Sequence, residues 1–287
     1  MERINRFFEN RQRIWGVAII AVFAFVYSMV QIVSYFLDER EMNRAMAEAR
    51  RLYQPPASET ATAANHLPRP VKTAIQVEKA IDRKDAELQK PLHWKNDPQN
   101  PLDIRDKFRE LLKLNEDVVG WLRIEGSAID YPVVQGGDNV FYLTHGLKKE
   151  KNVNGSIFMD YRNGPGTDKH LILYGHNMKN KTMFAELLHY ESRWFFERHP
   201  VIEFSTLYED TRWEIFSVHF TDIRHDYIRV DFENDSDFKT FVEDLKSRSL
   251  HPTDIRVDEK DMILTLSTCS AQRDDARFAV HARMITD

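Results

Sequence analysis

The sequence of 287 residues has a single cysteine, Cys269, so the chain cannot form an internal disulfide. It contains no glycine-rich phosphate loop, no Cys-x-x-Cys or His-Glu-x-x-His metal motif and no internal repeat. The net charge is only −5 and no basic face dominates, which argues against nucleic acid as a partner. These absences lead us to expect a protein that uses neither a metal ion nor another cofactor.

One long apolar run stands near the N-terminus. Residues 14–37 contain no Asp, Glu, Lys or Arg, and as a helix this run would measure roughly 36 Å, enough to cross a bilayer. Four arginines precede the run and two acidic residues follow it at once. The positive-inside rule then predicts a single-pass protein of the cell membrane, with residues 1–13 in the cytoplasm and the rest of the chain outside. A cleaved signal peptide is the alternative, but no small-x-small cleavage site closes the run.

The segment after the apolar run has the composition of a spacer. Residues 38–53 are rich in Glu, Arg, Ala and Met and would extend the membrane helix as a solvated stalk, whereas residues 54–70 resemble a linker. We therefore assign residues 38–100 to an extracellular stalk and linker, and residues 101–287 to a folded domain. Asp103 is the predicted N-cap of the first helix of that domain.

The folded domain is predicted to be mainly β-structure with flanking helices. In eight short runs the residues either alternate between apolar and polar or are continuously apolar, and turn residues separate the runs. This pattern predicts a closed or nearly closed β-barrel. The runs are Val118–Ile124, Ile129–Val134, Ser156–Asp160, Leu171–Tyr174, Val201–Phe204, Arg212–Phe220, Met262–Cys269 and Arg277–Met284. Three helices are expected between them, at residues 182–189, 191–198 and 236–249, and the last has apolar residues at helical spacing.

The last two strand-like runs bring the cysteine beside an arginine. Side chains alternate along a strand, so Thr265, Ser267 and Cys269 share one face. A short polar link joins the two runs, and such a hairpin would place Cys269 and Arg277 at the same end of neighbouring strands. A fixed cation favours the thiolate form of a cysteine, which is its nucleophilic form. The alternative is a small, buried cysteine without chemistry, the usual situation of a lone cysteine.

A cysteine nucleophile needs a proton acceptor, and eleven histidines are available. His176 is the first choice because it follows an apolar strand that ends in glycine, and catalytic groups favour loops at strand ends. A turn histidine that binds local backbone is the alternative at this position. His145, His219 and His281 are rivals. Of these His281 is the second choice, because it shares the alternation face of Arg277 but lies deeper along the strand.

Taken together, these stretches resemble a class B sortase, a membrane-anchored cysteine transpeptidase of Gram-positive bacteria. The resemblance rests on Thr265-Leu-Ser-Thr-Cys269, which fits the family's Thr-Leu-x-Thr-Cys signature, and on Arg277 at the start of the next strand. It also rests on Leu173-Tyr-Gly-His176-Asn-Met and on Gly155-Ser-Ile-Phe-Met-Asp-Tyr-Arg-Asn163. The resemblance extends from about residue 118 to the C-terminus. It implies an eight-stranded sortase-like barrel, in which the helix at residues 236–249 lies between strands six and seven.

The resemblance also implies a reaction. The enzyme would cleave a surface protein's C-terminal sorting signal of the Pro-x-Thr type after the threonine, hold the protein as a thioester on Cys269, and transfer it to an amine of the cell-wall precursor. By this analogy His176 is the general acid/base, and Arg277 positions the substrate and stabilises the oxyanion. The implied substrate-binding positions are Asn139, Leu143, Ser267 and Thr268.

Three other functions are open on the sequence. A pilin-polymerising sortase, with a pilin lysine as acceptor, gains no support from Asp97-Pro98, because glutamine rather than an aromatic residue follows. A hydrolytic cysteine protease is the second, although no Cys-Gly-Ser-Cys-Trp signature is present. A membrane-tethered binding module with a buried cysteine is the third. The residues do not distinguish Asn-Pro-x-Thr-Asn from Leu-Pro-x-Thr-Gly signals, and they do not name the acceptor amine.

Overall fold

The computed structural model describes residues 2–54, 104–164, 168–222, 226–269 and 276–286. The chain divides into two compact units, Met1–Arg44 and Ala45–Asp287. The first unit consists of helix α1 (Glu2–Tyr53) as far as residue 44. Within Ile19–Tyr53, an 18-residue window has a mean hydropathy of 2.0 and no buried residues. By length and composition α1 can therefore cross a membrane, as the apolar run predicts.

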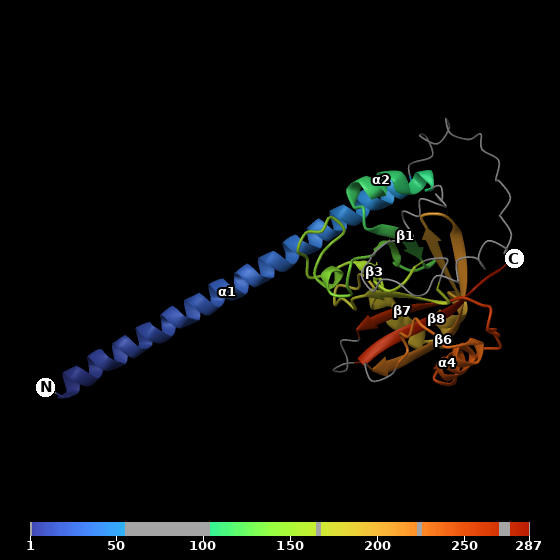
Figure 1. Ribbon diagram of the computed structural model, residues 1–287. Helices are drawn as coiled ribbons and strands as arrows, with labels where there is room; N and C mark the ends of the chain where they lie inside the picture. The colour runs from blue at the N-terminus through green and yellow to red at the C-terminus, as the bar shows by residue number, and fades with distance from the viewer. Residues whose placement is uncertain (1, 55–103, 165–167, 223–225, 270–275, 287) are drawn as a thin grey trace. The chain divides into compact units, whose positions relative to one another are not determined.

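The second unit is a β-barrel with helices on its surface. Its strands are β1 (Val118–Arg123), β2 (Asp130–Val134), β3 (Ile157–Met159), β4 (His170–Gly175), β5 (Val201–Thr206), β6 (Asp210–Asp222), β7 (Ile263–Cys269) and β8 (Ala276–Met284). Its helices are α2 (Asp106–Leu114), α3 (Arg193–Arg198) and α4 (Asp235–Ser247), with 3₁₀ helices η4 (Phe141–Leu143) and η5 (Ala185–Glu191). Figure 1 shows the strands of this unit, and among the described residues they close into a barrel in the order β1-β2-β3-β4-β7-β8-β6-β5. The predicted barrel is confirmed, and each predicted strand end is within two residues of the observed one.

One prediction about a helix needs correction, and another concerns a residue outside the described ones. The helix predicted at residues 182–189 is the 3₁₀ helix η5, which begins only at Ala185. Lys181 and Met183 have φ angles of 62° and 56°, and an α-helix cannot pass through residues in this left-handed region. The N-cap of α2 is Arg105, which makes no side-chain capping bond, and the predicted cap Asp103 lies outside the described residues.

The last two turns of α1 belong to the barrel unit. Ala49 is fully buried, and the ring of Tyr53 stacks on Trp121 of β1 with the ring centroids 4.3 Å apart. Stacked aromatic pairs of this kind stabilise a fold by about 0.5–1.5 kcal/mol beyond the area they bury. Residues 45–53 are therefore a packed part of the domain, and the prediction of a solvated stalk over residues 38–53 is wrong for this segment.

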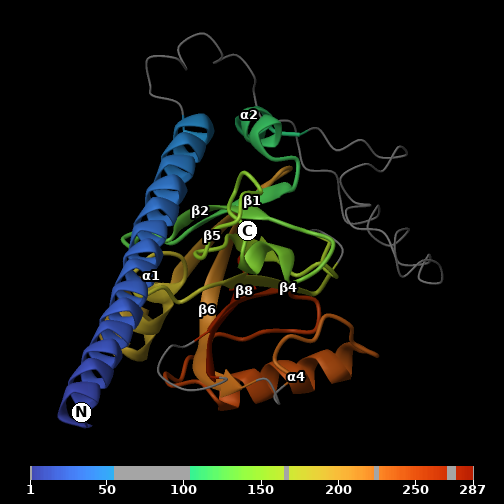
Figure 2. The same cartoon turned by 90° about the vertical axis from the view of Figure 1, so that its left-hand side faces the viewer.

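Helix α4 covers one side of the barrel (Figure 2). Asn234 caps its N-terminus, because its side chain accepts a hydrogen bond from the N–H of Asp237 at 3.0 Å. The apolar residues at helical spacing are buried, as predicted: Phe238, Phe241, Val242 and Leu245. They pack against one residue from each of β6, β7 and β8, namely Phe216, Ile263 and Ala279. Each such buried side chain contributes about 1.5–3 kcal/mol, so this contact holds α4 on the barrel.

Strand β7 has neighbours on both edges and cover on both faces. It pairs in parallel with β4 and antiparallel with β8, as expected for the predicted hairpin. The face that carries Ile263 is covered by α4, and the other face lines the barrel interior. All residues from 263 to 268 are buried, which is why the strand has a continuous apolar run with only small hydroxyl residues interrupting it.

Candidate active site

The register of three adjacent strands brings together the residues predicted to carry the chemistry. In the parallel pair of β4 and β7, Gly175, the last residue of β4, lies opposite Thr268; His176 follows β4 directly, and Cys269 is the last residue of β7. In the antiparallel pair of β7 and β8, Cys269 lies opposite Arg277. Position 269 is therefore the middle one of three neighbouring positions at one end of the sheet. Residues opposite one another in a sheet share a face, so positions 269 and 277 belong to the same face, and His176 follows β4 at the same end.

The backbone of a neighbouring turn holds the imidazole of His176. The ring is half-buried, and its Nε2 lies 2.7 Å from the carbonyl oxygen of Leu143. A carbonyl oxygen can only accept, so Nε2 carries the proton and donates it to this bond. In the neutral ring Nδ1 is then the free acceptor nitrogen. His176 thus has a fixed tautomer with one basic nitrogen available, which suits a general base.

The Leu143 carbonyl belongs to a turn that is packed tightly in place. Leu143 ends η4, and the neighbouring Tyr142 is fully buried and donates its hydroxyl to Asp117 at 2.7 Å. Gly155 lies against this turn with a φ of 60°, and a Cβ at this position would come within 2.6 Å of the Tyr142 carbonyl oxygen and 2.7 Å of the Leu143 carbonyl oxygen. Only glycine fits there. The motif that begins at Gly155 therefore helps to hold the acceptor for the Nε2 proton.

Tyr227 lies beside the same strands and was missed by the sequence analysis. Its hydroxyl is 2.9 Å from Oγ of Ser267, and its ring packs in the apolar cluster of α4. Burial raises the pKa of Tyr227, while the hydrogen bond of Ser267 and the positive charge of Arg277 act in the opposite direction. Tyr227 thus interacts with residues of both β7 and β8. No periodic pattern marks it, because it lies in the irregular segment between β6 and α4.

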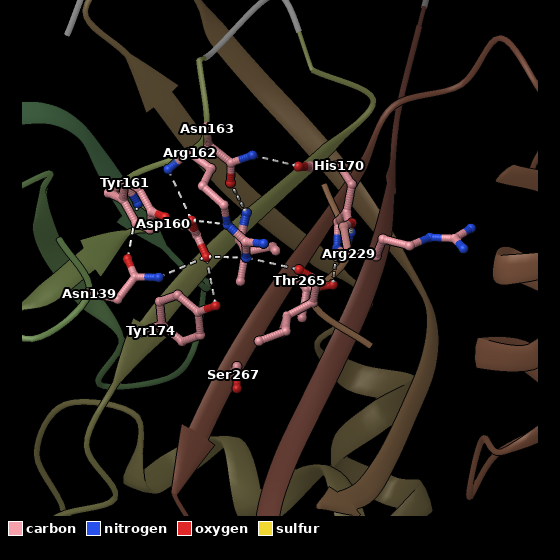
Figure 3. A network of polar contacts seen from close by, with 12 residues as sticks. Asn139, Asp160, Tyr161, Arg162, Asn163, His170, Tyr174, Arg229, Thr265 and Ser267 are labelled. Atoms are coloured by element: carbon pink, nitrogen blue, oxygen red, sulfur yellow. Dashed lines mark hydrogen bonds and ion pairs between the residues drawn. The ribbon is translucent and has the colours of Figure 1, made fainter. Parts of the chain in front are cut away.

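The residues predicted to bind substrate are half-buried or buried in the structure: Asn139, Leu143, Ser267 and Thr268. The side-chain amide of Asn139 points to Asp160 (Figure 3), to which its Nδ2 donates at 3.0 Å, and its Oδ1 accepts from the N–H of Tyr161 at 3.0 Å. One N–H of Asn139 is left for another partner. The hydroxyl of Ser267 is engaged by Tyr227. The substrate-binding role of all four residues stays a prediction.

Of the rival histidines, His281 lies well away from this strand end. His281 is fully buried, and four residues along β8 correspond to a separation of roughly 13 Å from the level of position 269. Its Nδ1 lies 2.7 Å from Oγ1 of Thr265, and burial lowers its pKa well below the ordinary value. His219 is buried and stacks on His281, and His145 packs on Phe141. Nowhere in the described residues do three or more His, Cys, Asp or Glu side chains group closely enough to hold a metal ion.

Comparison with known proteins identifies the family. Residues 122–285 match the sortase domain family. The chain belongs to the sortase family. Sortase B of Listeria monocytogenes is 40% identical over 187 residues, which cover 64% of this chain and 76% of the relative. Sortase B of Staphylococcus aureus is 40% identical over 185 residues, which cover 63% of this chain and 76% of that protein.

Solved structures of sortases agree with this assignment. The Staphylococcus aureus sortase B-substrate complex has a TM-score of 0.68 and 30% identity, with 87% of this chain and 99% of that chain covered. Sortase B of Bacillus anthracis in complex with AAEK1 has a TM-score of 0.67 and 32% identity, with 88% and 100% covered. The predicted class B sortase is confirmed, and the chain is a sortase-type cysteine transpeptidase.

Proposed function

We propose that this sortase uses Cys269 as its nucleophile, His176 as its general acid/base and Arg277 as the group that positions the substrate and stabilises the oxyanion. The observation that supports the assignment most strongly is the strand register, because position 269 lies between the other two at one end of β4, β7 and β8. The hydrogen bond from His176 Nε2 to the Leu143 carbonyl adds support, since it leaves Nδ1 to exchange a proton.

The proposed reaction has two acyl-transfer steps. The thiolate of Cys269 attacks the carbonyl carbon of the scissile bond, and the negative charge that develops on the oxygen is stabilised by the guanidinium of Arg277. When this intermediate collapses, the peptide C–N bond breaks, protonated His176 gives its proton to the leaving amine, and a thioester remains. A second amine then attacks the thioester, His176 accepts a proton from it, and the thiolate of Cys269 leaves.

The proposed substrate is the C-terminal sorting signal of a surface protein. The signal is of the Pro-x-Thr type, cleavage follows the threonine, and the acceptor is an amine of the cell-wall precursor. The family supports this substrate class, and the related Staphylococcus aureus enzyme has been solved as a complex with its substrate. Asn139, Leu143, Ser267 and Thr268 are the positions at which we expect substrate contacts.

The proposed location follows from the charges around the apolar run. Arginines precede residues 14–37 and acidic residues follow them, which supports a cytoplasmic N-terminus and a catalytic domain outside the membrane. Surface proteins in transit and cell-wall precursors are found on that side. Labelling of Lys148, an exposed residue of the barrel unit, by a membrane-impermeant reagent on intact cells would test this orientation.

A transfer assay on the detergent-solubilised full chain tests the proposed reaction. Peptides with Pro-x-Thr signals are incubated with and without a primary amine such as triglycine, and the products are identified by mass spectrometry. We expect cleavage after threonine and an amide product whose yield rises with the amine. Hydrolysis alone at saturating amine would favour a protease. Full activity of the Cys269→Ala variant would contradict the assignment of the nucleophile.

A further inference from the structure

The carboxylate of Asp160 is the centre of a hydrogen-bond network beside the proposed active site (Figure 3). Asp160 directly follows β3, and its side chain is 0% exposed. Its Oδ1 accepts from the backbone N–H and from Nε of Arg162, at 3.0 and 2.8 Å. Its Oδ2 accepts from Nη2 of Arg162 at 2.8 Å, from Nδ2 of Asn139 at 3.0 Å and from the hydroxyl of Tyr174 at 2.9 Å. All the acceptor capacity of this buried carboxylate is therefore in use.

These donors come from separate segments of the chain that lead to the proposed site. Asn139 stands just before η4, which ends at Leu143, the residue whose carbonyl accepts from His176. Tyr174 lies in β4, two residues before His176, which directly follows that strand. Asn139 and Tyr174 are therefore both bonded to Asp160, whereas the Leu143 carbonyl that accepts from His176 is held by the packing of Tyr142 and Gly155.

Arg162 extends the network to the opposite side of the site. Its Nη2 also donates to the carbonyl oxygen of Ile228 at 3.1 Å, in the segment between β6 and α4. The preceding residue is Tyr227, whose hydroxyl is bonded to Ser267. Ser267 in turn lies two residues before position 269 on the same face of β7. We call residues 226–234 the Tyr227 segment and residues 139–143 the Asn139 segment. The guanidinium of Arg162 thus connects these two segments through the carboxylate of Asp160.

We propose that Asp160 and Arg162 are a pair of positioning residues that sets the spacing between the Asn139 segment and the Tyr227 segment, and thereby the affinity for the sorting-signal peptide. This inference rests on the proposed function, because those segments carry the positions at which we expect the peptide to bind. Neither residue takes part in the reaction itself. The pair acts by holding the peptide-binding segments, so its loss raises KM and leaves the reactivity of Cys269 unchanged.

A second pair in the same chain provides a matched control. Asp244 of α4 and Arg248, the C-cap of that helix, are also joined by two hydrogen bonds, from Nε at 2.8 Å and from Nη2 at 3.0 Å. Both side chains are partly exposed and follow one another on the same helix, four residues apart. The two bonds join residues one helical turn apart, so this pair has the ion-pair chemistry of Arg162 and Asp160 within a single element. Any effect of an Arg→Lys change that is independent of position would appear at both sites.

The test measures kcat, KM and the alkylation rate of Cys269 in the full chain for Arg162→Lys, Asp160→Asn, the double variant and Arg248→Lys. Lysine keeps the positive charge, but its single ammonium group cannot bind both oxygens of Asp160 and the carbonyl oxygen of Ile228 in the way that the planar guanidinium does. In the Asp160→Asn variant one of the two oxygens becomes an NH₂ group, which donates. Both oxygens of Asp160 accept from Arg162, so in either orientation of the amide this NH₂ group faces a donor of Arg162 and a hydrogen bond is lost. Loss of a hydrogen bond to a charged group corresponds to a change in KM on the order of tenfold.

We expect KM to rise about tenfold in each of the two single variants, by the hydrogen-bond estimate above, and less than additively in the double variant. We expect kcat, the alkylation rate and all values for Arg248→Lys to stay unchanged. Thermal unfolding shows whether the Asp160→Asn variant folds. If it does not, the KM of the Arg162→Lys variant alone tests the inference. Unchanged KM in a folded Arg162→Lys variant would overturn the inference, as would a fall confined to kcat and alkylation. A wild-type chain that forms no acyl-enzyme would instead overturn the proposed function, and this inference with it.

Discussion

Strands β4, β7 and β8 carry two groups of polar residues, one at the strand ends and one deeper along the strands. The end group is His176, position 269 and Arg277. The deeper group is His170, Thr265 and His281, four to six residues or roughly 13–20 Å further along the strands, and its members are all fully buried. Both groups contain histidine and a residue of β7, so residue type alone does not explain why only one is proposed to react.

The hydrogen bonds of the deeper group explain the difference. His170 donates from Nδ1 to the Arg229 carbonyl at 2.7 Å, so its Nε2 accepts the Thr265 hydroxyl proton at 2.6 Å. The Thr265 oxygen then accepts from Nδ1 of His281 at 2.7 Å. Burial lowers the pKa of His170 to about 4 and that of His281 well below its ordinary value. Both histidines are therefore held neutral in full burial, where His281 Nε2 has no hydrogen-bond partner among the described residues, whereas the half-buried His176 can exchange a proton through Nδ1.

The largest expected effect separates the two groups by activity. Replacement of His176 by glutamine removes the proposed general acid/base, and we expect the rate of peptide cleavage to fall by about 10²–10⁴-fold. His281→Gln is the matched variant from the deeper group, and activity per folded molecule should be unchanged. Steady-state cleavage of a sorting-signal peptide measures both. Equal losses in the two variants would remove the distinction between the groups.

The second effect separates two arginines of one strand. Arg277→Lys keeps a positive charge but loses the planar fork, and we expect the rate to fall about a hundredfold. Arg283 lies on the same face of β8, six residues away, where it pairs with Glu214 at 3.3 Å. Arg283→Lys should leave the rate unchanged. If Arg277→Lys retained the wild-type rate, the oxyanion role would pass to other groups, such as backbone N–H donors.

A third prediction concerns stability. Thr265→Val leaves Nε2 of His170 and Nδ1 of His281 without their shared partner on the buried face of β7 that α4 covers. We expect the free energy of unfolding to fall by about 1–3 kcal/mol, while the folded fraction keeps its activity. Thr240→Val, on the exposed surface of α4, is the control and should change little. Urea unfolding followed by tyrosine and tryptophan fluorescence measures the difference, and equal midpoints for the two variants would argue against the role of the hydroxyl.

The smallest effect is the pH dependence that the deeper group gives to stability. The pKa of His170 is about 4 in the folded chain and 6.5 ordinarily, so below pH 6.5 the unfolded chain binds more protons than the folded chain. The contribution is fully present above pH 6.5 and is lost as the pH falls towards 4. We expect the Tm to decline over this range, and less steeply in His170→Gln. Replacement of the exposed His189 by glutamine is the control and should leave the slope of Tm against pH unchanged. A slope as steep in His170→Gln as in the wild type would contradict the assigned role of His170.

The strand pattern was sufficient to predict the barrel and the pairing of position 269 with Arg277, whereas the position of His176 at a strand end left two interpretations open. Residues 277–284 alternate strictly, and the run before Cys269 is continuously apolar, so a hairpin that places Cys269 opposite Arg277 followed from local signals alone. The same holds for α4, because its four apolar residues are at helical spacing and all become buried. These elements are predictable because burial of one face decides their structure.

Tertiary contacts decided what the sequence could not show. Tyr227 and Ile228 lie in an irregular segment whose position depends on Ser267 and Arg162, which are distant in sequence. Asp160 was visible only as part of a motif, and its five hydrogen bonds come from three segments of the chain. Residues 45–53 have the composition of a solvated helix, and nothing local indicated that Tyr53 would stack on Trp121.

The central claim is that position 269 carries a nucleophile that the strand register sets between a base and a cation. The most direct test is the intact mass of the full chain after it has been mixed with a sorting-signal peptide, with Cys269→Ala as control. The account predicts a hydroxylamine-labile adduct on Cys269, equal in mass to the peptide's N-terminal part through threonine. It also predicts no adduct in the Cys269→Ala variant. An adduct that persists in this variant, or the absence of any adduct in a chain that still cleaves the peptide, would contradict it.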